Sequence, residues 1–284
     1  MSRHRIFVAA IVLLALGAST SSAAFVDYDG FDYAGTTLND QNGGSGWSGP
    51  WFPTGTSPTI QLSDDNTSLT YPTPFESPLI APAPTGDRVL HTGDALNNAS
   101  SSRLLSQTTD MGAAGNVLYA SALIQKNSVA SATNDSILFE FVDANGNRRF
   151  GFGIEAAEGF WINANASNQV GTALQGETYF LVARLVTDDD ASPGDTASLK
   201  VFGPGTTLIP AVEPIDWDVS ISTNSAAVLD RVRLRIDRNQ QNASVDELRI
   251  GDSWQSVVSA IPEPTSAAFL ALLFIPLASR RARP

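Results

Sequence analysis

The chain has 284 residues and is acidic, with 29 Asp and Glu residues against 17 Lys and Arg residues and a net charge of −12. A surface of this charge repels nucleic acid and anionic lipid, so neither is expected as a partner of the folded body. The sequence has no cysteine and only two histidines, which excludes disulfides, thiolate metal sites, cysteine nucleophiles and metal sites built from several histidines. The fold must therefore be stabilised by its hydrophobic core or by bound ions such as calcium.

Residues 1–24 have the pattern of a secretory signal peptide. Two arginines within the first five residues precede the apolar and small-residue stretch Ile6–Gly17, which is too short to favour a permanent membrane span. Ser22 and Ala24 place small side chains at the −3 and −1 positions of a cleavage site before Phe25. The protein is therefore predicted to be exported through the inner membrane, with a mature chain that begins at Phe25.

The first part of the mature chain, residues 25–115, is rich in Gly, Pro, Ser, Thr and Asn and shows no helical periodicity. Its composition predicts loops at 42–46 and 77–86. Thr59–Leu62 and Arg88–His91 lie between turn residues and fit short strands. This part is therefore expected to be rich in loops.

Strand patterns become clearer from residue 116 onward. Alternate residues of 117–123 face one way in an extended run, and Ile137–Val142 follows as a mostly apolar strand. The Asn145-Gly146 pair accepts the positive φ angle that a tight hairpin requires. Arg149–Ile154 is therefore expected to return beside that strand, and Gly159–Asn163 adds a further short one.

A second hairpin is predicted from Tyr179–Thr187 and Ala197–Phe202, which an acidic loop connects. Leu229–Asp237 then shows the clearest alternation, and Ser244–Ile250 closes the body as a last strand. In Leu229–Asp237 one face is expected to pack on a core and the other to meet solvent. The residues expected in the core are Val232, Leu234 and Ile236, and those expected in solvent are Arg231, Arg233 and Arg235.

Many short strands joined by hairpin turns, with no helices between them, predict an antiparallel sandwich rather than a parallel α/β sheet. No repeat of fixed period is visible, which argues against a propeller or a solenoid. Residues 25–258 are therefore expected to form one all-β domain.

The C-terminal segment 261–284 contains Pro-Glu-Pro, then the apolar run Thr265–Ser279, then a group of arginines. As a helix this run would reach roughly 22 Å, against ~30 Å for the hydrocarbon core of a bilayer, and Pro276 weakens the helix further. The run is therefore a marginal transmembrane helix suited to transient insertion, with the arginines favouring the cytoplasmic side. A plain membrane anchor is the simpler alternative.

The order of these three features resembles the PEP-CTERM sorting signal. The residues that carry the resemblance are Pro262, Glu263, Pro264, Arg280, Arg281 and Arg283. The resemblance implies processing near Pro-Glu-Pro by an exosortase, a membrane enzyme, in a bacterium that makes extracellular polysaccharide. It implies a location in the cell envelope, at the outer surface or in the extracellular matrix, and it leaves open whether the tail is cleaved or stays as an anchor.

The two ends of the body carry short motifs. Asp29–Tyr33, Gly43–Trp47 and Trp51 lie near its start, and Val245–Gly251 and Trp254 lie near its end. Together they resemble the concanavalin A-like (laminin G-like) jelly-roll domains that are often joined to such sorting tails. This resemblance implies a jelly-roll β-sandwich whose first and last strands lie together.

Some jelly rolls hydrolyse glycans, and a retaining hydrolase needs two carboxyl groups ~5–5.5 Å apart. No segment here has the Glu-x-Asp-x-x-Glu spacing of laminarinase-like enzymes, and Glu155 and Glu158 flank a predicted turn. His91 has no Gly-x-Ser-x-Gly elbow nearby with which to complete a serine triad. No catalytic residue is therefore assigned, and a non-catalytic protein is expected.

Clustered oxygen ligands raise calcium as a cofactor, because jelly rolls often hold calcium at loop edges. The acidic residues that crowd the loop of the second hairpin are Asp188, Asp189, Asp190 and Asp195. A solvated acidic loop explains the same residues without a metal, so both interpretations stay open.

Carbohydrate binding would use aromatic faces stacked on sugar rings. The aromatic candidates are Trp47, Trp51, Phe52, Trp161 and Trp217. For Trp47 and Trp51, in a Gly-rich loop, contact with a carbohydrate and packing in the core both stay open. The expected function is a non-catalytic envelope or matrix protein with weak affinity for extracellular polysaccharide. The alternatives are a carbohydrate-active enzyme, either hydrolase or lyase, and a purely structural adhesive module.

Overall fold

The fold is taken from a computed structural model, which describes the chain with gaps. The described residues are 26–55, 58–76, 84, 86–92, 98–128, 136–155, 159–164, 167–189, 194–237 and 242–259. The predicted signal peptide and sorting tail lie outside these ranges, as do Glu158 and Asp190. Within the described part of the chain, no helix is long and apolar enough to cross a membrane.

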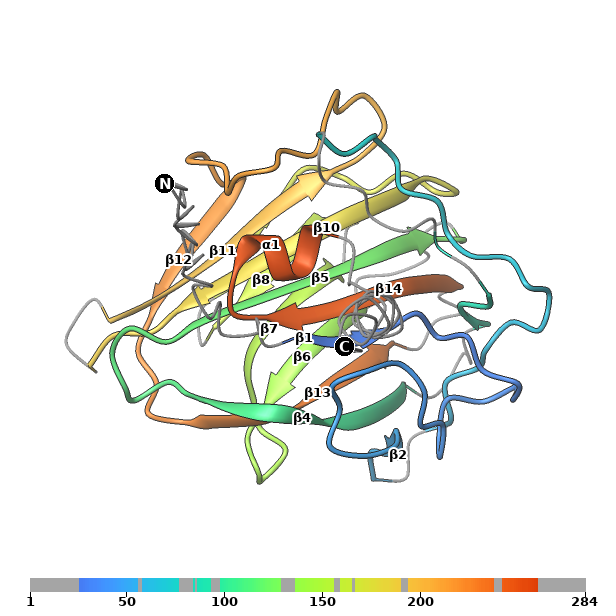
Figure 1. The fold of residues 1–284 in the computed structure, drawn as a ribbon, viewed down its shortest axis with the longest axis horizontal. Coiled ribbons are helices and arrows are strands. Elements are labelled where there is room, and N and C mark those ends of the chain that lie inside the picture. Colours follow the sequence, from blue (N-terminus) through green and yellow to red (C-terminus); the bar gives the residue numbers. More distant parts are fainter. Residues whose placement is uncertain are drawn as a thin grey trace, which may run out of the picture.

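Two antiparallel sheets pack face to face (Figure 1), which confirms the predicted jelly-roll sandwich. The sheet nearer the viewer in Figure 1, which we call the back sheet, contains, in spatial order, β1 (Val26–Asp29), β14 (Ala243–Gly251), β5 (Val117–Lys126), β10 (Thr178–Val186), β11 (Asp195–Phe202) and β12 (Val219–Thr223), with β3 (Val89–His91) paired to β14. The front sheet contains β2 (Phe52–Pro53), β4 (Ala99–Asp110), β13 (Val228–Ile236), β6 (Ile137–Val142), β7 (Arg148–Glu155), β8 (Gly159–Asn163) and β9 (Ser167–Val170).

The core lies between the two sheets and is filled by their inward faces. On β13, Val232, Leu234 and Ile236 are fully buried, as the alternation predicts. On β6 and β7 facing phenylalanines pack in pairs, and the ring centroids of Phe139 and Phe152 are 5.5 Å apart. Because side chains alternate between the faces of a strand, the residues between these phenylalanines point to the outer face of the front sheet.

The turn between β6 and β7 is the predicted Asn-Gly turn. Gly146 has a φ angle of +80°, and the carboxylate of Asp143 accepts hydrogen bonds from the backbone N–H groups of Asn145 and Asn147, each at 2.9 Å. Arg149 also donates to this carboxylate. Desolvation opposes the effect, but these hydrogen bonds outweigh it and lower the pKa of Asp143 to about 2. The turn itself therefore engages this carboxylate.

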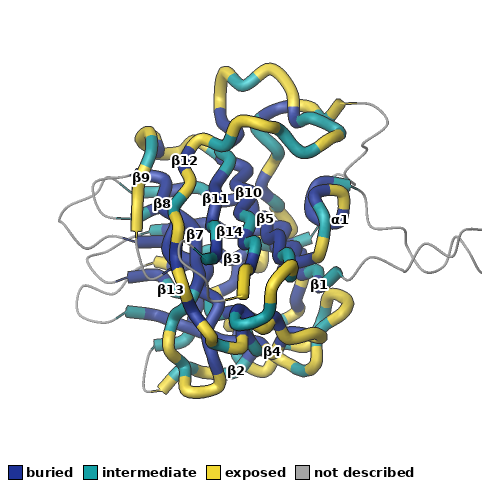
Figure 2. The backbone as a smooth tube through the Cα atoms, turned by 90° about the vertical axis from the view of Figure 1, so that its left-hand side faces the viewer, coloured by how far each residue is buried: buried dark blue, intermediate teal, exposed yellow. Residues whose placement is uncertain are grey.

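A second hydrophobic cluster covers the outer face of the back sheet. Phe180 and Phe202 project outward from β10 and β11, and Trp254 of helix α1 (Trp254–Val258) and Ile209 of the β11–β12 loop pack over them. In Figure 2 the helix lies on the opposite side of the sandwich from the front sheet. The helix therefore covers the outer face of the back sheet and leaves the outer face of the front sheet uncovered.

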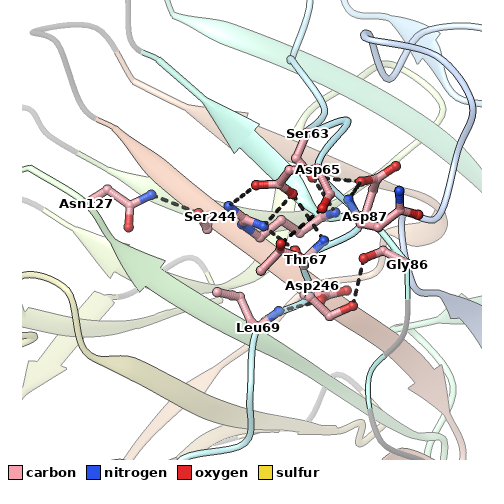
Figure 3. A network of polar contacts seen from close by, with 12 residues as sticks. Ser63, Asp65, Thr67, Leu69, Gly86, Asp87, Asn127, Ser244 and Asp246 are labelled. Carbon is pink, nitrogen blue, oxygen red and sulfur yellow. Dashed lines mark hydrogen bonds and ion pairs between the residues drawn. The ribbon is translucent and has the colours of Figure 1, made fainter.

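The first and last strands of the body pair, as the resemblance implies, with Val26 opposite Gly251. The segment before β3 is fastened to β14, because the backbone N–H of Leu69 donates to the carboxylate of Asp246 at 2.9 Å (Figure 3). Burial, reinforced by the charge of Glu247, raises the pKa of Asp246 well above its usual value. β14 is thus joined to β1 by backbone pairing and to the segment before β3 by a side-chain hydrogen bond.

Candidate functional site

The motif near the start of the body forms a buried ion-pair hub. Nη1 of Arg103 lies 2.6 Å from Oδ2 of Asp29, and both side chains are only 1% exposed. Tyr33 Oη and Trp51 Nε1 donate to the same carboxylate oxygen at 2.5 and 2.7 Å. Arg103 also donates to backbone carbonyl oxygens of the loop at 43–49. Because a buried charge is tolerated only when it is paired and hydrogen-bonded, this motif serves the fold.

The interpretation of Trp51 as a carbohydrate contact is wrong. Its side chain is fully buried in the main core, because the Gly-rich loop folds back over the hub and directs the indole N–H at Asp29. Trp47 is partly buried, its Nε1 donates to the carbonyl oxygen of Tyr28 at 2.8 Å, and the guanidinium of Arg103 lies 4.7 Å from its ring centroid. Contact between Trp47 and a carbohydrate stays a prediction, although Arg103 already occupies one face of the ring.

The motif near the end of the body is also structural. Glu247 and Arg249 form an ion pair of 2.7 Å with both side chains 1% exposed, and Tyr28 Oη donates to Glu247 at 2.9 Å. Glu247 has a φ angle of +53° at the irregularity where β14 changes its register against β5. This backbone conformation turns the side chain of Glu247 toward Arg249. Arg249 Nη1 donates to the carbonyl oxygen of Ser259 at 2.6 Å. The motif therefore fixes the point at which the chain leaves the sandwich.

A different set of side chains gathers on the outer face of the front sheet, and we call it the outer-face cluster. Its members are Glu140 of β6, Arg148 of β7, Trp161 of β8, and Arg233 and Arg235 of β13. Glu140 is fully buried, with Arg233 Nε 2.6 Å from one carboxylate oxygen and Arg148 Nη1 3.0 Å from the other. Arg235 Nη1 lies 3.6 Å from that second oxygen. Glu140 thus orients the guanidinium groups of Arg148 and Arg233 by hydrogen bonds, whereas that of Arg235 is held by Asp237, which accepts from its Nε at 2.6 Å.

The arginines of β13 were expected to meet solvent, and they do so only in part. The side chains of Arg233 and Arg235 are 16% and 30% exposed, and that of Arg148 is 32% exposed. N–H groups of Arg148 and Arg233 bind Glu140, and Nε of Arg235 binds Asp237. Because each guanidinium carries five donors, the exposed edges of Arg148 and Arg235 present further N–H groups to a ligand. Sequence alternation placed these side chains on the correct face but missed their shared partner.

Glycines on β7 make room for Trp161. A methyl group added to Gly151 would lie 3.2 Å from Cζ3 of Trp161, so the indole rests against the backbone of β7. The guanidinium of Arg148 lies 4.9 Å from the ring centroid of Trp161, a cation–π contact. Trp161 is therefore only 1% exposed, and its indole N–H has no hydrogen-bond partner among the described residues. A ligand on this face would meet the edge of Arg148 before the indole.

A cavity of about 500 Å³ opens at the β6–β7 turn, beside the start of β13. Its polar lining residues are Asp143, Asn145, Arg149, Asn224 and Ser225. Arg233 Nη1 donates to the carbonyl oxygen of Gly146 in the same turn at 3.2 Å. Amide, carboxylate and guanidinium groups therefore extend from the outer-face cluster to the end of the sheet, a donor and acceptor set that suits hydroxyl-rich ligands.

The remaining candidates give no second site in the described part of the chain. Asp188 and Asp189 are exposed, whereas Asp195 is buried in β11 and accepts the backbone N–H of Asp188 at 3.1 Å. Among the residues that the structure describes, no three acidic or imidazole groups gather closely enough to hold a metal ion. Calcium at this loop stays a prediction. Glu155 receives a hydrogen bond from Gln169, and His91 is buried in β3.

Comparison with known proteins gave similarity to solved structures only. No protein-family model matches the sequence, and no curated protein matches it. An endo-β-1,4-glucuronan lyase from the fungus Trichoderma reesei is 9% identical, with 78% of this chain and 96% of that chain covered and a TM-score of 0.45. The globular domain of T. cruzi calreticulin is 9% identical, with 83% and 90% covered and a TM-score of 0.45.

A carbohydrate esterase from the Shiga toxin-encoding bacteriophage phi24B is 13% identical, with 77% of this chain and 99% of that chain covered and a TM-score of 0.43. Similarity at this level transfers neither a ligand nor a reaction to this chain. The class that its own structure defines is an antiparallel jelly-roll sandwich with a charged cluster on one outer face.

Proposed function

We propose that this chain is an exported envelope or extracellular-matrix protein whose sandwich binds polysaccharide without cleaving it. The observation that carries the proposal is the outer-face cluster, where the buried Glu140 holds the guanidinium groups of Arg148 and Arg233, and Asp237 holds that of Arg235 beside them. Donors that are already oriented lose little entropy on binding, so they favour recognition of sugar hydroxyl or carboxylate oxygens. The predicted signal peptide and the PEP-CTERM-like tail support export and sorting by an exosortase.

The non-catalytic part of the proposal is supported by the residue types on this sheet. Both carboxylate oxygens of Glu140 are engaged by arginines, an arrangement that suits a structural anion better than a nucleophile or a proton donor. The residues of the named front-sheet strands include no histidine, tyrosine or lysine. Their polar side chains are mainly arginine and serine, and of their four carboxylates Glu140 and Asp230 form ion pairs with arginines of the same sheet.

Affinity electrophoresis of the exported protein in gels that contain host exopolysaccharide tests this proposal. Arg235→Ala removes exposed donors but leaves Arg148 and Arg233 on Glu140, so we expect its dissociation constant to rise about tenfold, the loss of one hydrogen bond from a charged donor. Arg184→Ala is the matched control. Arg184 lies on β10 of the back sheet, pairs with Glu213, and stacks on Trp217 at 4.7 Å in the same manner as Arg148 on Trp161.

The control variant should migrate like the wild type. Equal retardation of wild type and Arg235→Ala would remove the outer-face cluster as the binding surface. Release of new reducing ends or unsaturated sugars by the wild type would instead favour the carbohydrate-active enzyme, and no retardation in any gel would favour a structural adhesive module.

A further inference from the structure

The loop between β11 and β12, residues 203–218, exposes large apolar side chains next to the point where the chain leaves the sandwich. Ile215 is 97% exposed, Val212 is 68% exposed and Leu208 is 40% exposed. Three of the six large hydrophobic side chains that are exposed in the described part of the chain therefore lie within eight residues of this loop. Exposed apolar side chains scattered singly need no explanation, but a local group of them marks a contact surface.

This loop is fixed to the body. Ile209 is fully buried, and its backbone N–H donates to the carbonyl oxygen of Pro74 at 2.9 Å. Trp254 of α1 donates through Nε1 to the carbonyl oxygen of Pro210 at 3.0 Å, and Trp217 packs edge-on against Trp254 at 6.0 Å. The exposed side chains are thus presented from an anchored backbone that touches α1.

The carboxylates of the loop are largely matched by cations of the back sheet. Glu213 forms an ion pair with Arg184, and Asp218 forms one with Lys200 at 2.9 Å. Asp216 is the acidic residue of the loop that has no ion pair in the described part of the chain. The unpaired charge of the loop is thus the exposed carboxylate of Asp216, beside Ile215. One negative charge among apolar side chains suits a zwitterionic lipid surface better than an anionic one.

The length of chain beyond α1 supplies the second observation. Ser259 is the last described residue, and Arg249 holds its carbonyl oxygen. Only residues 260–264 separate it from the apolar run 265–279, and five residues span at most roughly 17 Å. Whenever that run is inside a bilayer, α1 must stay within this distance of the membrane surface.

We infer that the β11–β12 loop is the membrane-contacting surface of the protein, with Val212 and Ile215 entering the interfacial region of a zwitterionic bilayer while the tail is inserted. The inference rests on the tail insertion that forms part of the proposed function. It orients the sandwich, because α1 and the front sheet lie on opposite sides (Figure 2), so the outer-face cluster faces away from the membrane.

Labelling at single cysteines tests the inference, because the chain has no cysteine of its own. The full chain is reconstituted with vesicles of phosphatidylcholine, half of it brominated, and carries an environment-sensitive fluorophore at one of three sites. Ile215→Cys reports on the loop, Thr265→Cys on the tail, and Asn145→Cys, exposed at the β6–β7 turn of the front sheet, is the control. We expect quenching at positions 215 and 265 and none at 145.

Quenching at 265 without quenching at 215 would overturn the inference and leave tail insertion standing, whereas no quenching at 265 would overturn both.

A second measurement places a charge on the loop. Ile215→Asp should lower the partition coefficient of the protein onto phosphatidylcholine vesicles about tenfold. Val228→Asp, at a 44% exposed apolar residue of the front sheet, should leave this partition coefficient unchanged. Equal effects of the two substitutions would also contradict the orientation.

Discussion

Glu140 is a buried carboxylate that accepts hydrogen bonds from arginines of two neighbouring strands. It is the one charged residue in the apolar strand Ile137–Val142, and a carboxylate in such a strand signals a buried cationic partner, because burial of an unpaired charge is too costly. Its partners, however, come from β7 and from β13, the latter more than 90 residues away. The strand and its direction are readable locally, whereas the identity of partners across a sheet depends on topology that no local pattern contains.

Removal of the Glu140 charge should destabilise the protein strongly. Glu140→Ala leaves the guanidinium groups of Arg148 and Arg233 without their shared anion, and breaking a buried ion pair costs about 3–5 kcal/mol. Urea denaturation monitored by circular dichroism measures the change in the free energy of unfolding. Glu155→Ala, at the edge of the same sheet and only partly buried, should cost under about 1 kcal/mol. Comparable losses for the two variants would show that the carboxylate of Glu140 is not shared in this way.

The pairing with Glu140 also changes the expectation for Arg233. As a solvent-facing residue it would tolerate substitution by Asp with little loss. Because its Nε lies 2.6 Å from the buried Glu140, Arg233→Asp brings two carboxylates together and is expected to cost as much as Leu234→Asp, several kcal/mol. Thermal melts of the two variants test this. A small effect of Arg233→Asp alone would restore the simple alternation of a solvent face and a core face.

Asp246 should make stability depend on pH. Burial raises its pKa in the folded state above the unfolded value of 3.8, so the folded protein binds the proton more tightly. The stabilisation from this proton is complete below the unfolded pKa and is lost as the pH rises through the folded pKa. Asp246→Asn keeps an acceptor for the N–H of Leu69 without the charge, so its melting temperature relative to wild type should rise from pH 4 toward neutrality. A difference that stays constant over this range would contradict the raised pKa.

In β7 a repeated Phe-Gly pair determines what packs on each face of the front sheet. Phe150 and Phe152 fill the core, and Gly151 leaves the outer face low enough for Trp161 to rest on it. The alternation is visible in the sequence as Phe-Gly-Phe-Gly. The packing of Trp161 on the glycine face cannot be read from this pattern, because it depends on which strand lies next to β7 in the sheet.

Gly153 is the position of β7 least able to accept a side chain. Its φ angle is +151°, and an added methyl group would lie 2.1 Å from the carbonyl oxygen of Ile137. Gly153→Ala should therefore cost more than the ~1 kcal/mol typical of a glycine that needs positive φ. Gly115→Ala is the control, since Gly115 has a φ angle of +81° and no atom within 4 Å of the added methyl group. Differential scanning calorimetry should show a clearly larger loss at position 153.

The hydrogen bond between Asp29 and Trp51 connects β1 to the loop that precedes β2. Trp51→Ala should cost about 3–5 kcal/mol, the value for removal of a buried aromatic side chain. Trp47→Ala, at a partly exposed residue, should cost less and leave the fold intact. Near-ultraviolet circular dichroism separates these outcomes, and a folded, fully stable Trp51→Ala variant would contradict the hub.

The sequence predicts the class of fold, most of the strands from Val117 onward and the Asn145-Gly146 turn, and the jelly-roll resemblance implies the pairing of the first and last strands. The residue pattern misses β4 and β9, whose polar residues give no apolar alternation, and the short strand β12. It does not predict the division of the strands between two sheets or the gathering of arginines on one of them. Both depend on contacts between residues far apart in the chain. The outer-face cluster draws its residues from four strands, so no local pattern contains it.

Export and sorting are expected to shorten the chain at both ends. Cleavage before Phe25 and processing near Pro262-Glu263-Pro264 would leave the described sandwich with only a few residues beyond Ser259. Intact-mass spectrometry of the protein recovered from an exosortase-bearing host measures both ends at once. A mature form that keeps residues 265–284 would contradict processing, and one that keeps Ile6–Gly17 would contradict export by this route.

The hydrogen bond from Arg249 to the carbonyl oxygen of Ser259 has a mechanical consequence. In a tethered protein, tension on the tail enters the sandwich at the end of β14, a strand flanked by β1 on one side and β5 on the other. A load along β14 acts in shear on both ladders of backbone hydrogen bonds at once, so many bonds must break together rather than one after another. If polysaccharide bound to the outer-face cluster pulls against a tail held at the membrane, the fold would therefore resist extension between these two points of attachment.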